Sequence, residues 1–405
     1  MKIWKKILLM IFLSIYIISP ICIADDFSYN DEYETLNISE VNTTSLEEPI
    51  VNSKHAIVIE RKTLSVLYEK SGFEETPMAS TTKIMTCILA LEKCDLSKIV
   101  TVSKAASFVH GSTLGLKENM QISVNDLLYG LMLRSGNDCA IAIAEEISGS
   151  LENFAVLMNN KAKELNLKNT NFVTPHGLDD PNHYTTAYDL AILTDYALKN
   201  ETFKNIVSCK SYSFNFNGYP KTINNTNELL GNLSGVYGVK TGFTFDAGRC
   251  LVSACQRNDL DIIVVVLGAD TKKIRTQDSY NLINYTNSNF QYVNVSKTIE
   301  ENFSNFQSYI RDSIVLEKTT DIPKFKLEVL DNYEFPLKTN GHVKLNTKIY
   351  TIKNFSSDFT MGEQVGTLYL YNNNDLICES KILLDNELKR NSWMFYFKNF
   401  FEIFK

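Results

Sequence analysis

Ser80 and Lys83 form the one Ser-x-x-Lys sequence of this 405-residue chain. Side chains three positions apart lie on one face of a helix, so the hydroxyl and the amine can touch. If Ser80 opens the helix, the helix dipole favours an oxyanion there. A lysine that is partly desolvated near other cations can lose its proton near neutral pH and then take the proton of a serine. The pair therefore indicates a serine nucleophile with a lysine base, or else a helix-capping serine with a surface lysine.

Two further triplets place polar side chains where the local pattern does not require them. Ser135-Gly136-Asn137 interrupts an apolar helical region. It indicates either a rigid loop that offers a hydroxyl and an amide to a substrate or an ordinary helix–helix turn. Lys240-Thr241-Gly242 follows a strand-like run, and Gly242 would let a peptide backbone approach closely. The alternative for this triplet is a solvated edge strand with a protective lysine.

The surrounding pattern predicts the elements that must position these triplets. A β-hairpin is expected over residues 56–69, and two strong strands over 249–256 and 262–268. Helices are expected between these strands and just after them, at 80–92, 126–147 with its polar interruption, 154–165, 186–199 and 271–285. Strands, then helices, then strands indicate an α+β domain whose sheet is completed by distant parts of the chain.

The C-terminal part of the chain has a different composition. Short β-like runs punctuated by turn residues lie at 325–330, 342–352 and 365–371, which predicts a second, small all-β domain over 291–385. Residues 386–405 contain seven aromatic side chains and read as an amphipathic helix. This segment is too short and too charged to span a bilayer, so a helix lying in the membrane interface fits better. The alternative is a helix packed on the β domain.

The N-terminal part reads as a leader and a spacer. Residues 1–24 combine three lysines, an apolar run and small residues at the expected cleavage positions, which is typical of a secretory signal peptide. A lipoprotein site at Cys22 and an uncleaved anchor are the alternatives. Residues 25–53 carry eight acidic residues and no lysine or arginine, so we expect an acidic, disordered spacer. The predicted location is therefore extracytoplasmic.

Composition excludes some functions. The formal net charge of −7 argues against a nucleic-acid partner, which would normally need a basic surface. The chain has no C-x-x-C pair, and His110, His176 and His183 form no H-x-x-x-H pattern, so no metal site is predicted. We expect no cofactor.

Taken in order, the three triplets resemble the Ser-x-x-Lys, Ser-x-Asn and Lys-Thr-Gly signature of penicillin-binding proteins and serine β-lactamases. Their separations are similar to those of the low-molecular-mass branch, the D-alanyl-D-alanine carboxypeptidases. The resemblance extends to the segments around the triplets, at residues 77–86, 126–138, 171–178, 186–190 and 240–248. It covers residues 54–290 as a penicillin-binding/β-lactamase-like catalytic domain, an antiparallel sheet with a helical block.

The resemblance implies a role for each motif residue. Ser80 would be the acylated nucleophile, Lys83 its base, and Ser135 the group that passes the proton to the leaving D-alanine. The substrate would be held by a set of five further residues and their backbone groups: Asn137, Lys240, Thr241, Phe243 and Arg275. Gly242 would lie in the same binding strand, and the backbone N–H groups of Ser80 and Phe243 would form the oxyanion hole. Some relatives have histidine where this chain has Phe243, which keeps the backbone donor but not that side chain.

The resemblance implies an exported serine-type D-Ala-D-Ala carboxypeptidase that acts on peptidoglycan pentapeptides and is acylated by β-lactam antibiotics. It also implies attachment to the outer face of the membrane through the C-terminal helix. A class A-like β-lactamase is one alternative, although those enzymes use a dedicated glutamate and a Ser-Asp-Asn triplet. A non-catalytic penicillin- or wall-binding module is another. The intact set Ser80, Lys83, Ser135 and Lys240 argues against the second alternative.

Overall fold

The computed structural model describes residues 47–339 and 343–402. The chain divides into two compact units, and the boundary lies between Ser288 and Asn289. The predicted signal peptide over 1–24 lies outside the described residues, as does most of the predicted acidic spacer. Within that spacer, however, Val51 and Ser53 are buried, and Ser53 donates to Asp278 Oδ2 through both its amide and its hydroxyl.

The first unit is built on a five-stranded antiparallel sheet with the order β2–β1–β9–β8–β7. The two N-terminal strands form the predicted hairpin, and the other three come from much later in the chain. Their bounds are β1 His55–Glu60, β2 Val66–Lys70, β7 Val236–Thr244, β8 Gly248–Arg257 and β9 Leu260–Ala269. Central β8 and β9 are buried along almost their whole length, because the sheet is covered on both faces. This explains why both strands read as continuous apolar runs.

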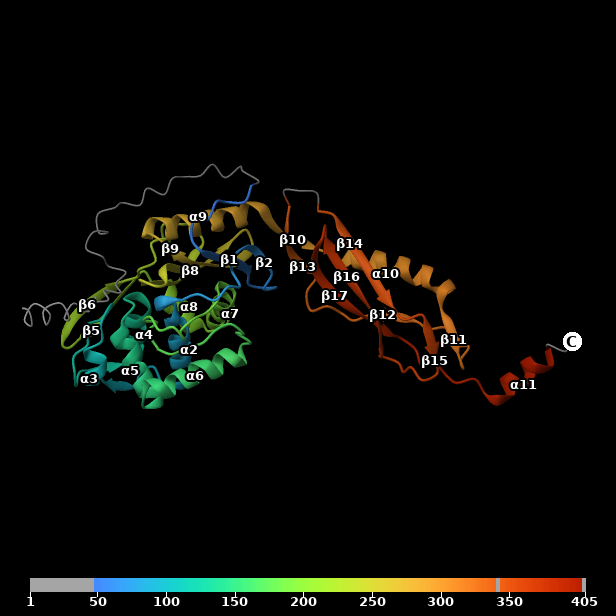
Figure 1. The fold of residues 1–405 in the computed structure, drawn as a ribbon, viewed down its shortest axis with the longest axis horizontal. Helices are drawn as coiled ribbons and strands as arrows, with labels where there is room; N and C mark the ends of the chain where they lie inside the picture. The colour runs from blue at the N-terminus through green and yellow to red at the C-terminus, as the bar shows by residue number, and fades with distance from the viewer. Residues whose placement is uncertain (1–46, 340–342, 403–405) are drawn as a thin grey trace, which may run out of the picture. The chain divides into compact units, whose positions relative to one another are not determined.

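Helices cover both faces of this sheet. Figure 1 shows α9 (Lys272–Asn289) along one face and the helical block with α2 (Lys83–Lys93) on the other. The other helices of this unit are α3 Lys104–Ser107, α4 Val124–Leu133, α5 Asn137–Ser148, α6 Leu151–Glu164, α7 Ala187–Leu198 and α8 Glu201–Ser208. Five of them begin after a side chain that accepts an N–H of the first turn, namely Ser103, Ser123, Ser150, Thr186 and Asn200. Two short hairpins complete the unit, β3 Ile99–Thr101 with β4 Gln121–Ser123 and β5 Ser211–Phe216 with β6 Tyr219–Asn224.

The predicted helix over 80–92 begins later than expected. Ala79–Thr82 is a 3₁₀ turn, and the α-helix starts at Lys83. Ala79 has a φ of +48°, which is unfavourable for a residue with a Cβ and separates the turn from the preceding chain. Ser80 therefore lies in a tight turn that leads into α2, instead of opening the α-helix itself.

The second unit contains a four-stranded antiparallel sheet with the order β12–β17–β16–β14 and two smaller strand pairs. The sheet strands are β12 Phe325–Leu327, β14 Leu345–Thr351, β16 Gln364–Asn372 and β17 Asp375–Leu384. The smaller pairs are β10 Phe290–Asn294 with β13 Glu334–Lys338, and β11 Val315–Glu317 with β15 Asn354–Ser356. Together the two units give an α+β protein, as predicted.

The prediction of an all-β second domain is wrong, because the second unit contains the helix α10 (Ser296–Ile310). Ile299, Phe303 and Ile310 are buried in the core of this unit. They recur at helical spacing, but polar residues separate them and their apolar stripe is narrow. The helical pattern of residues 296–310 was therefore too weak to be predicted among the strand-like segments that follow it.

The predicted C-terminal helix is shorter than expected. The described part of α11 covers Trp393–Glu402, whereas residues 388–392 are not helical. Leu388 is only 2% exposed and belongs to the core of the second unit. No helix within the described part of the chain is both long and apolar enough to cross a bilayer.

Candidate active site

The turn before α2 brings Ser80 and Lys83 into contact. The Lys83 Nζ atom lies 2.8 Å from Ser80 Oγ. Lys83 is fully buried, and Ser80 is only partly exposed. A buried ammonium next to a hydroxyl is unusual, since burial of a charge needs compensating partners. The geometry matches a nucleophile and a base within hydrogen-bond reach of each other.

Two further oxygen atoms surround the Lys83 amine. Lys83 Nζ donates to Asn137 Oδ1 over 2.8 Å and to the main-chain oxygen of His176 over 2.7 Å. Asn137 in turn donates from Nδ2 to the main-chain oxygen of His110, also over 2.7 Å. The helix α5 therefore presents Asn137 to Lys83, and both polar atoms of this amide are engaged within the protein. In this geometry Asn137 fixes the lysine.

Ser135 lies immediately before α5 in a left-handed backbone conformation, with a φ of +61° and a side chain that is buried. Such a conformation costs a serine about 1–3 kcal/mol and persists where surrounding contacts impose it. These contacts include Asp138, whose carboxylate accepts the backbone N–H groups of three consecutive residues, Leu114, Gly115 and Leu116. The Ser135-Gly136-Asn137 turn is therefore held rigidly against the neighbouring loop.

The strand β7 carries Lys240, Thr241 and Gly242 beside the nucleophile turn. Lys240 and Thr241 are each 1% exposed, and Lys240 Nζ donates to the main-chain oxygen of Thr241 over 3.0 Å. A Cβ atom at Gly242 would lie 3.1 Å from Ala79 Cβ. A side chain here would force the strand or the turn that carries Ser80 to shift by a few tenths of an ångström, and glycine avoids this shift.

The Phe243 side chain contributes to packing at the end of β7. Phe243 pairs with Arg249 across β7 and β8, and the Arg249 guanidinium lies 3.9 Å from the ring centroid. A second aromatic ring, that of Phe245, meets Phe243 edge-to-face at 5.7 Å. This cation–π and aromatic cluster gives the side chain a cross-strand role, while the backbone N–H of Phe243 stays on the strand that borders Ser80.

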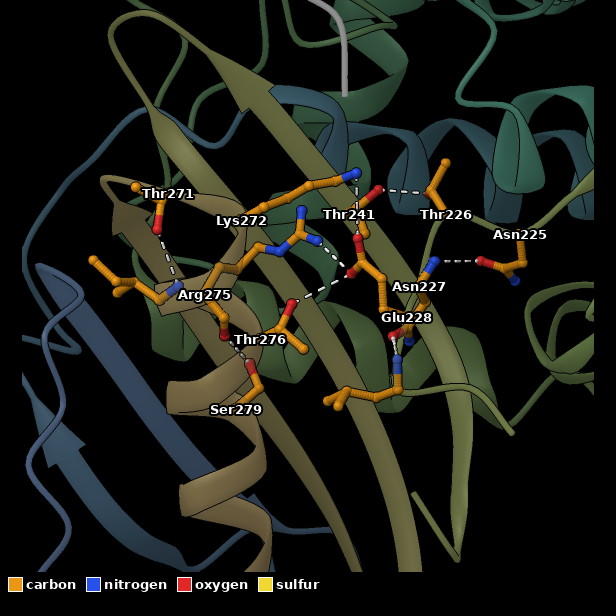
Figure 2. Close-up of polar contacts among 12 residues, drawn as sticks. Asn225, Thr226, Asn227, Glu228, Thr241, Thr271, Lys272, Arg275, Thr276 and Ser279 are labelled. Atoms are coloured by element: carbon orange, nitrogen blue, oxygen red, sulfur yellow. Dashed lines mark hydrogen bonds and ion pairs between the residues drawn. The ribbon is translucent and has the colours of Figure 1, made fainter. Parts of the chain in front are cut away.

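Arg275 lies in a buried ion pair. Its side chain is fully buried, and its Nη2 atom lies 2.5 Å from Glu228 Oε2. Figure 2 shows this pair beside Lys272, whose Nζ lies 3.5 Å from the other carboxylate oxygen of Glu228. The structure thus does not present the Arg275 side chain to solvent, where a substrate carboxylate would arrive. Sequence reasoning missed Glu228, because an isolated glutamate 47 residues from Arg275 gives no local signal.

Two neutral histidines support the loop that supplies the His176 oxygen. Burial, followed by the nearby charge of Lys83, lowers the pKa of His176 to about 3. Burial lowers the pKa of His183 to about 4, although Asp180 opposes the shift. His183 Nδ1 accepts the Val173 N–H, and its Nε2 lies 2.8 Å from Thr82 Oγ1. A neutral ring thus joins this loop to the nucleophile turn.

The same loop depends on Gly177, which has a φ of +86°. A Cβ atom there would lie 1.9 Å from the main-chain oxygen of Ala79, which is impossible without movement of one backbone. The loop thus packs directly onto the nucleophile turn. The part played by the His176 main-chain oxygen was not predictable from residue type, because every residue has such an oxygen.

Among the described residues, no three His, Cys, Asp or Glu side chains gather in a way that could hold a metal ion. The described cysteines are free, and four of them, Cys87, Cys139, Cys250 and Cys255, are buried. Burial raises the pKa of the Cys139 thiol well above its usual range, and the neighbouring Asp138 adds to the shift. Both effects favour the protonated, less reactive form of this cysteine.

Known proteins share both the sequence and the fold. A family model described as D-alanyl-D-alanine carboxypeptidase, peptidase family S11, matches residues 42–271. D-alanyl-D-alanine carboxypeptidase DacF of Bacillus subtilis is 33% identical over 359 residues, which cover 85% of this chain and 88% of that protein. D-alanyl-D-alanine carboxypeptidase DacC of Escherichia coli is 39% identical over 254 residues, which cover 60% of this chain and 62% of that protein.

Among solved structures, penicillin binding protein 5 from Haemophilus influenzae superposes with a TM-score of 0.68 at 27% identity. The superposition covers 85% of this chain and all of that one. The DD-transpeptidase of Streptomyces K15 gives a TM-score of 0.57 at 32% identity, over 59% of this chain and 98% of that one. These matches confirm the α+β fold and the family predicted from the three triplets: the chain belongs to the D-alanyl-D-alanine carboxypeptidase family.

Proposed function

We propose that this carboxypeptidase removes the terminal D-alanine of peptidoglycan pentapeptides through an acyl-enzyme on Ser80. The observation that carries the proposal is the 2.8 Å contact between Lys83 Nζ and Ser80 Oγ in a largely buried site. A general base must lie within hydrogen-bond reach of the proton that it removes, and this pair meets that requirement. The names of the similar proteins support the same reaction.

In the first step, the neutral amine of Lys83 takes the Ser80 proton while Ser80 Oγ attacks the carbonyl carbon of the D-Ala-D-Ala bond. Lys83 must first have lost one proton, because its Nζ donates to three oxygen atoms in the geometry described above. The negative charge on the carbonyl oxygen is stabilised by the backbone N–H groups of Ser80 and Phe243. The C–N bond then breaks, and Lys83 passes the proton that it took from Ser80 through Ser135 to the leaving amine, which returns Lys83 to its neutral form.

In the second step, water attacks the ester carbon and transfers a proton to Lys83, and Ser80 leaves as the restored hydroxyl. The shortened peptide carries the new carboxylate. Asn137, Lys240 and Thr241 bind the substrate in this proposal, and Gly242 gives the strand its close approach. The Asn137 amide has two N–H groups and two acceptor lone pairs, so it can bind a substrate amide while keeping its contacts with His110 and Lys83.

The test of this function is release of D-alanine from a peptide that ends in D-Ala-D-Ala. We expect the unchanged protein to release D-alanine and Ser80→Ala to release none, with Ser97→Ala as the control because Ser97 is an exposed serine bonded to Asp95. Release by Ser80→Ala at the rate of the control would refute the assignment. Turnover of β-lactams without release of D-alanine would instead favour the β-lactamase alternative.

We further propose that the protein acts outside the cytoplasmic membrane and lies on its outer face through α11. The proposal is supported by the exposure of aromatic side chains on this helix: Trp393 is 71% exposed, and Phe397 and Phe400 are each more than half exposed. A soluble helix rarely presents so many aromatic side chains to water, and an interfacial helix does. In this structure α11 does not bury these side chains on the β-rich unit, which disfavours the alternative of a packed helix.

Liposome flotation tests the anchor. The structure favours truncation after Ser392 over truncation after Asp385, because Leu388 is part of the core and Lys389 N donates to Asp321 Oδ2. Both proteins would lack residues 1–24. We expect the longer protein to float with liposomes and the protein that ends at Ser392 to remain at the bottom. If both float or both remain, α11 is not the anchor.

A further inference from the structure

We infer that Thr226 is a positioning residue that sets the Thr241 hydroxyl for binding of the substrate's terminal carboxylate. We also infer that the ion pair between Glu228 and α9 holds Thr226 in place. This inference rests on the proposed function, and the two residues to which it gives new roles, Thr226 and Glu228, lie outside the three sequence triplets.

The first observation is a direct contact between two hydroxyl groups. Thr226 Oγ1 lies 2.6 Å from Thr241 Oγ1 (Figure 2). A hydroxyl has one proton to donate and two lone pairs that accept. When Thr226 donates to Thr241, the proton of Thr241 is free to point toward a bound carboxylate. Without Thr226, Thr241 can rotate to other partners, and the carboxylate loses an oriented donor.

The second observation is the way in which the loop carrying Thr226 is attached to β7. This loop, residues 225–235, joins β6 to β7. Asn227 is buried, and its Nδ2 donates to the main-chain oxygen of Gly238 over 2.8 Å. Its Oδ1 accepts the Leu229 N–H, and Leu229 is fully buried. The residues on either side of Glu228 therefore fasten the loop to β7 and to the core.

The third observation is that Glu228 fastens the same loop to a different element. Its carboxylate meets three side chains from the first turns of α9: Lys272, Arg275 and Thr276. A carboxylate near a helix N-terminus is also favoured by the helix dipole. Because the Arg275 side chain is fully buried, removal of Glu228 would take away the carboxylate that the Arg275 Nη2 atom contacts. Such a loss is strongly destabilising for the local arrangement.

These contacts give Arg275 a role that differs from direct substrate binding. The guanidinium holds the Glu228 carboxylate and thereby the loop of residues 225–235. The loop in turn holds the Thr226 hydroxyl in contact with the Thr241 hydroxyl. The charge also matters: the single negative charge of Glu228 offsets the buried Arg275 guanidinium, while the second cation of the group, Lys272, is partly exposed to solvent.

The test compares acylation by two probes in the full-length protein. One is a penicillin with its free carboxylate, and the other is the methyl ester of the same penicillin, which lacks the charge. We expect Thr226→Val to lower the ratio of the two rate constants, acid over ester, by about tenfold, because a hydrogen bond to a charged group is lost. Thr226→Ser keeps the hydroxyl and should restore the ratio to within about twofold of the unchanged protein.

The matched control is Thr222→Val. Thr222 also makes a hydroxyl contact of 2.8 Å, with Ser213, but on the exposed hairpin of β5 and β6. We expect it to leave the ratio unchanged. If Thr226→Val leaves the ratio unchanged, or lowers both rates equally, the inference is overturned. If the unchanged protein is not acylated at all, the proposed function fails and the inference fails with it.

Glu228→Gln tests the second part. It removes the charge but keeps the shape, and we expect it to lower the acid-over-ester ratio by about threefold or more through disorder of the loop. Its control is Glu146→Gln, because Glu146 has the same side-chain exposure of 21% and pairs with a lysine far along the chain, Lys98. A higher ratio in Glu228→Gln would mean that a released Arg275 binds the substrate itself, and it would overturn the role assigned to Glu228.

Discussion

Gly242 lies so close to Ser80 that a Cβ atom on the glycine would stand 3.0 Å from the Ser80 backbone nitrogen. This nitrogen belongs to the proposed oxyanion hole, and the other donor is the N–H of Phe243, the residue after the glycine. The distance between the two donors therefore depends on the absence of a side chain at position 242. In the proposed oxyanion hole, Gly242 would therefore set the distance between the two donors.

Gly242→Ala should reduce acylation by about 10²-fold or more, since loss of one oxyanion donor in acyl-transfer enzymes has an effect of that size. The rate constant of acylation by a fluorescent penicillin measures it. Gly149→Ala is the control: Gly149 ends α5 with a φ of +76°, and a Cβ there would contact nothing within 4 Å. The control should lose stability but keep its acylation rate. Equal rates for both variants would show that the close approach is unimportant.

Lys83→Arg keeps the positive charge but removes the ability to deprotonate near neutral pH. We expect the acylation rate at pH 7 to fall by about 10²- to 10⁴-fold, the usual contribution of general base catalysis. Lys161→Arg is the control, because Lys161 is a partly buried lysine that pairs with Glu92 and Glu164 on the helical block. Near-normal acylation by Lys83→Arg would show that another group is the base.

Because of His183, the free energy of unfolding should fall as the pH is lowered. Its pKa in the folded protein is about 4, below the ordinary value near 6.5, so the unfolded chain binds more protons between these values. Its contribution is fully present above pH 6.5 and is lost as the pH falls toward 4. Between pH 7 and pH 5 the free energy of unfolding should fall by about 2 kcal/mol on account of this residue.

Urea unfolding at pH 7 and pH 5, followed by near-ultraviolet circular dichroism, measures this contribution. In His183→Gln the difference between the two pH values should be smaller by that amount, because glutamine does not titrate. His176, with a folded-state pKa of about 3, should behave in the same direction. An unchanged pH dependence in His183→Gln would mean that the ring is not buried in its neutral form.

Much of the fold could be predicted because the relevant signals are local. The hairpin of β1 and β2, the apolar runs of β8 and β9, and the helices α6 and α7 all lie close to the expected positions. Apolar runs and helical periodicity are properties of short segments, which explains this success. The helix α10 was missed because only Ile299, Phe303 and Ile310 mark its buried face.

The less predictable features depend on tertiary contacts. The 3₁₀ turn at Ser80 requires the unusual backbone of Ala79, which packing with Gly177 imposes and which has no signature in residue type. Likewise, Arg275 could be assigned to the site by resemblance, but its partner Glu228 could not. The triplets reveal the chemistry, whereas the contacts that hold each triplet come from residues with no motif of their own.

The central claim, that Ser80 is the nucleophile, is tested most directly by mass spectrometry of the protein after brief exposure to penicillin. We expect the intact protein to gain the mass of one penicillin, and the peptide that contains Ser80 to carry all of it. Ser80→Ala should gain no mass under the same conditions. An adduct on Ser135 or on any other residue, or an adduct on Ser80→Ala, would contradict the account.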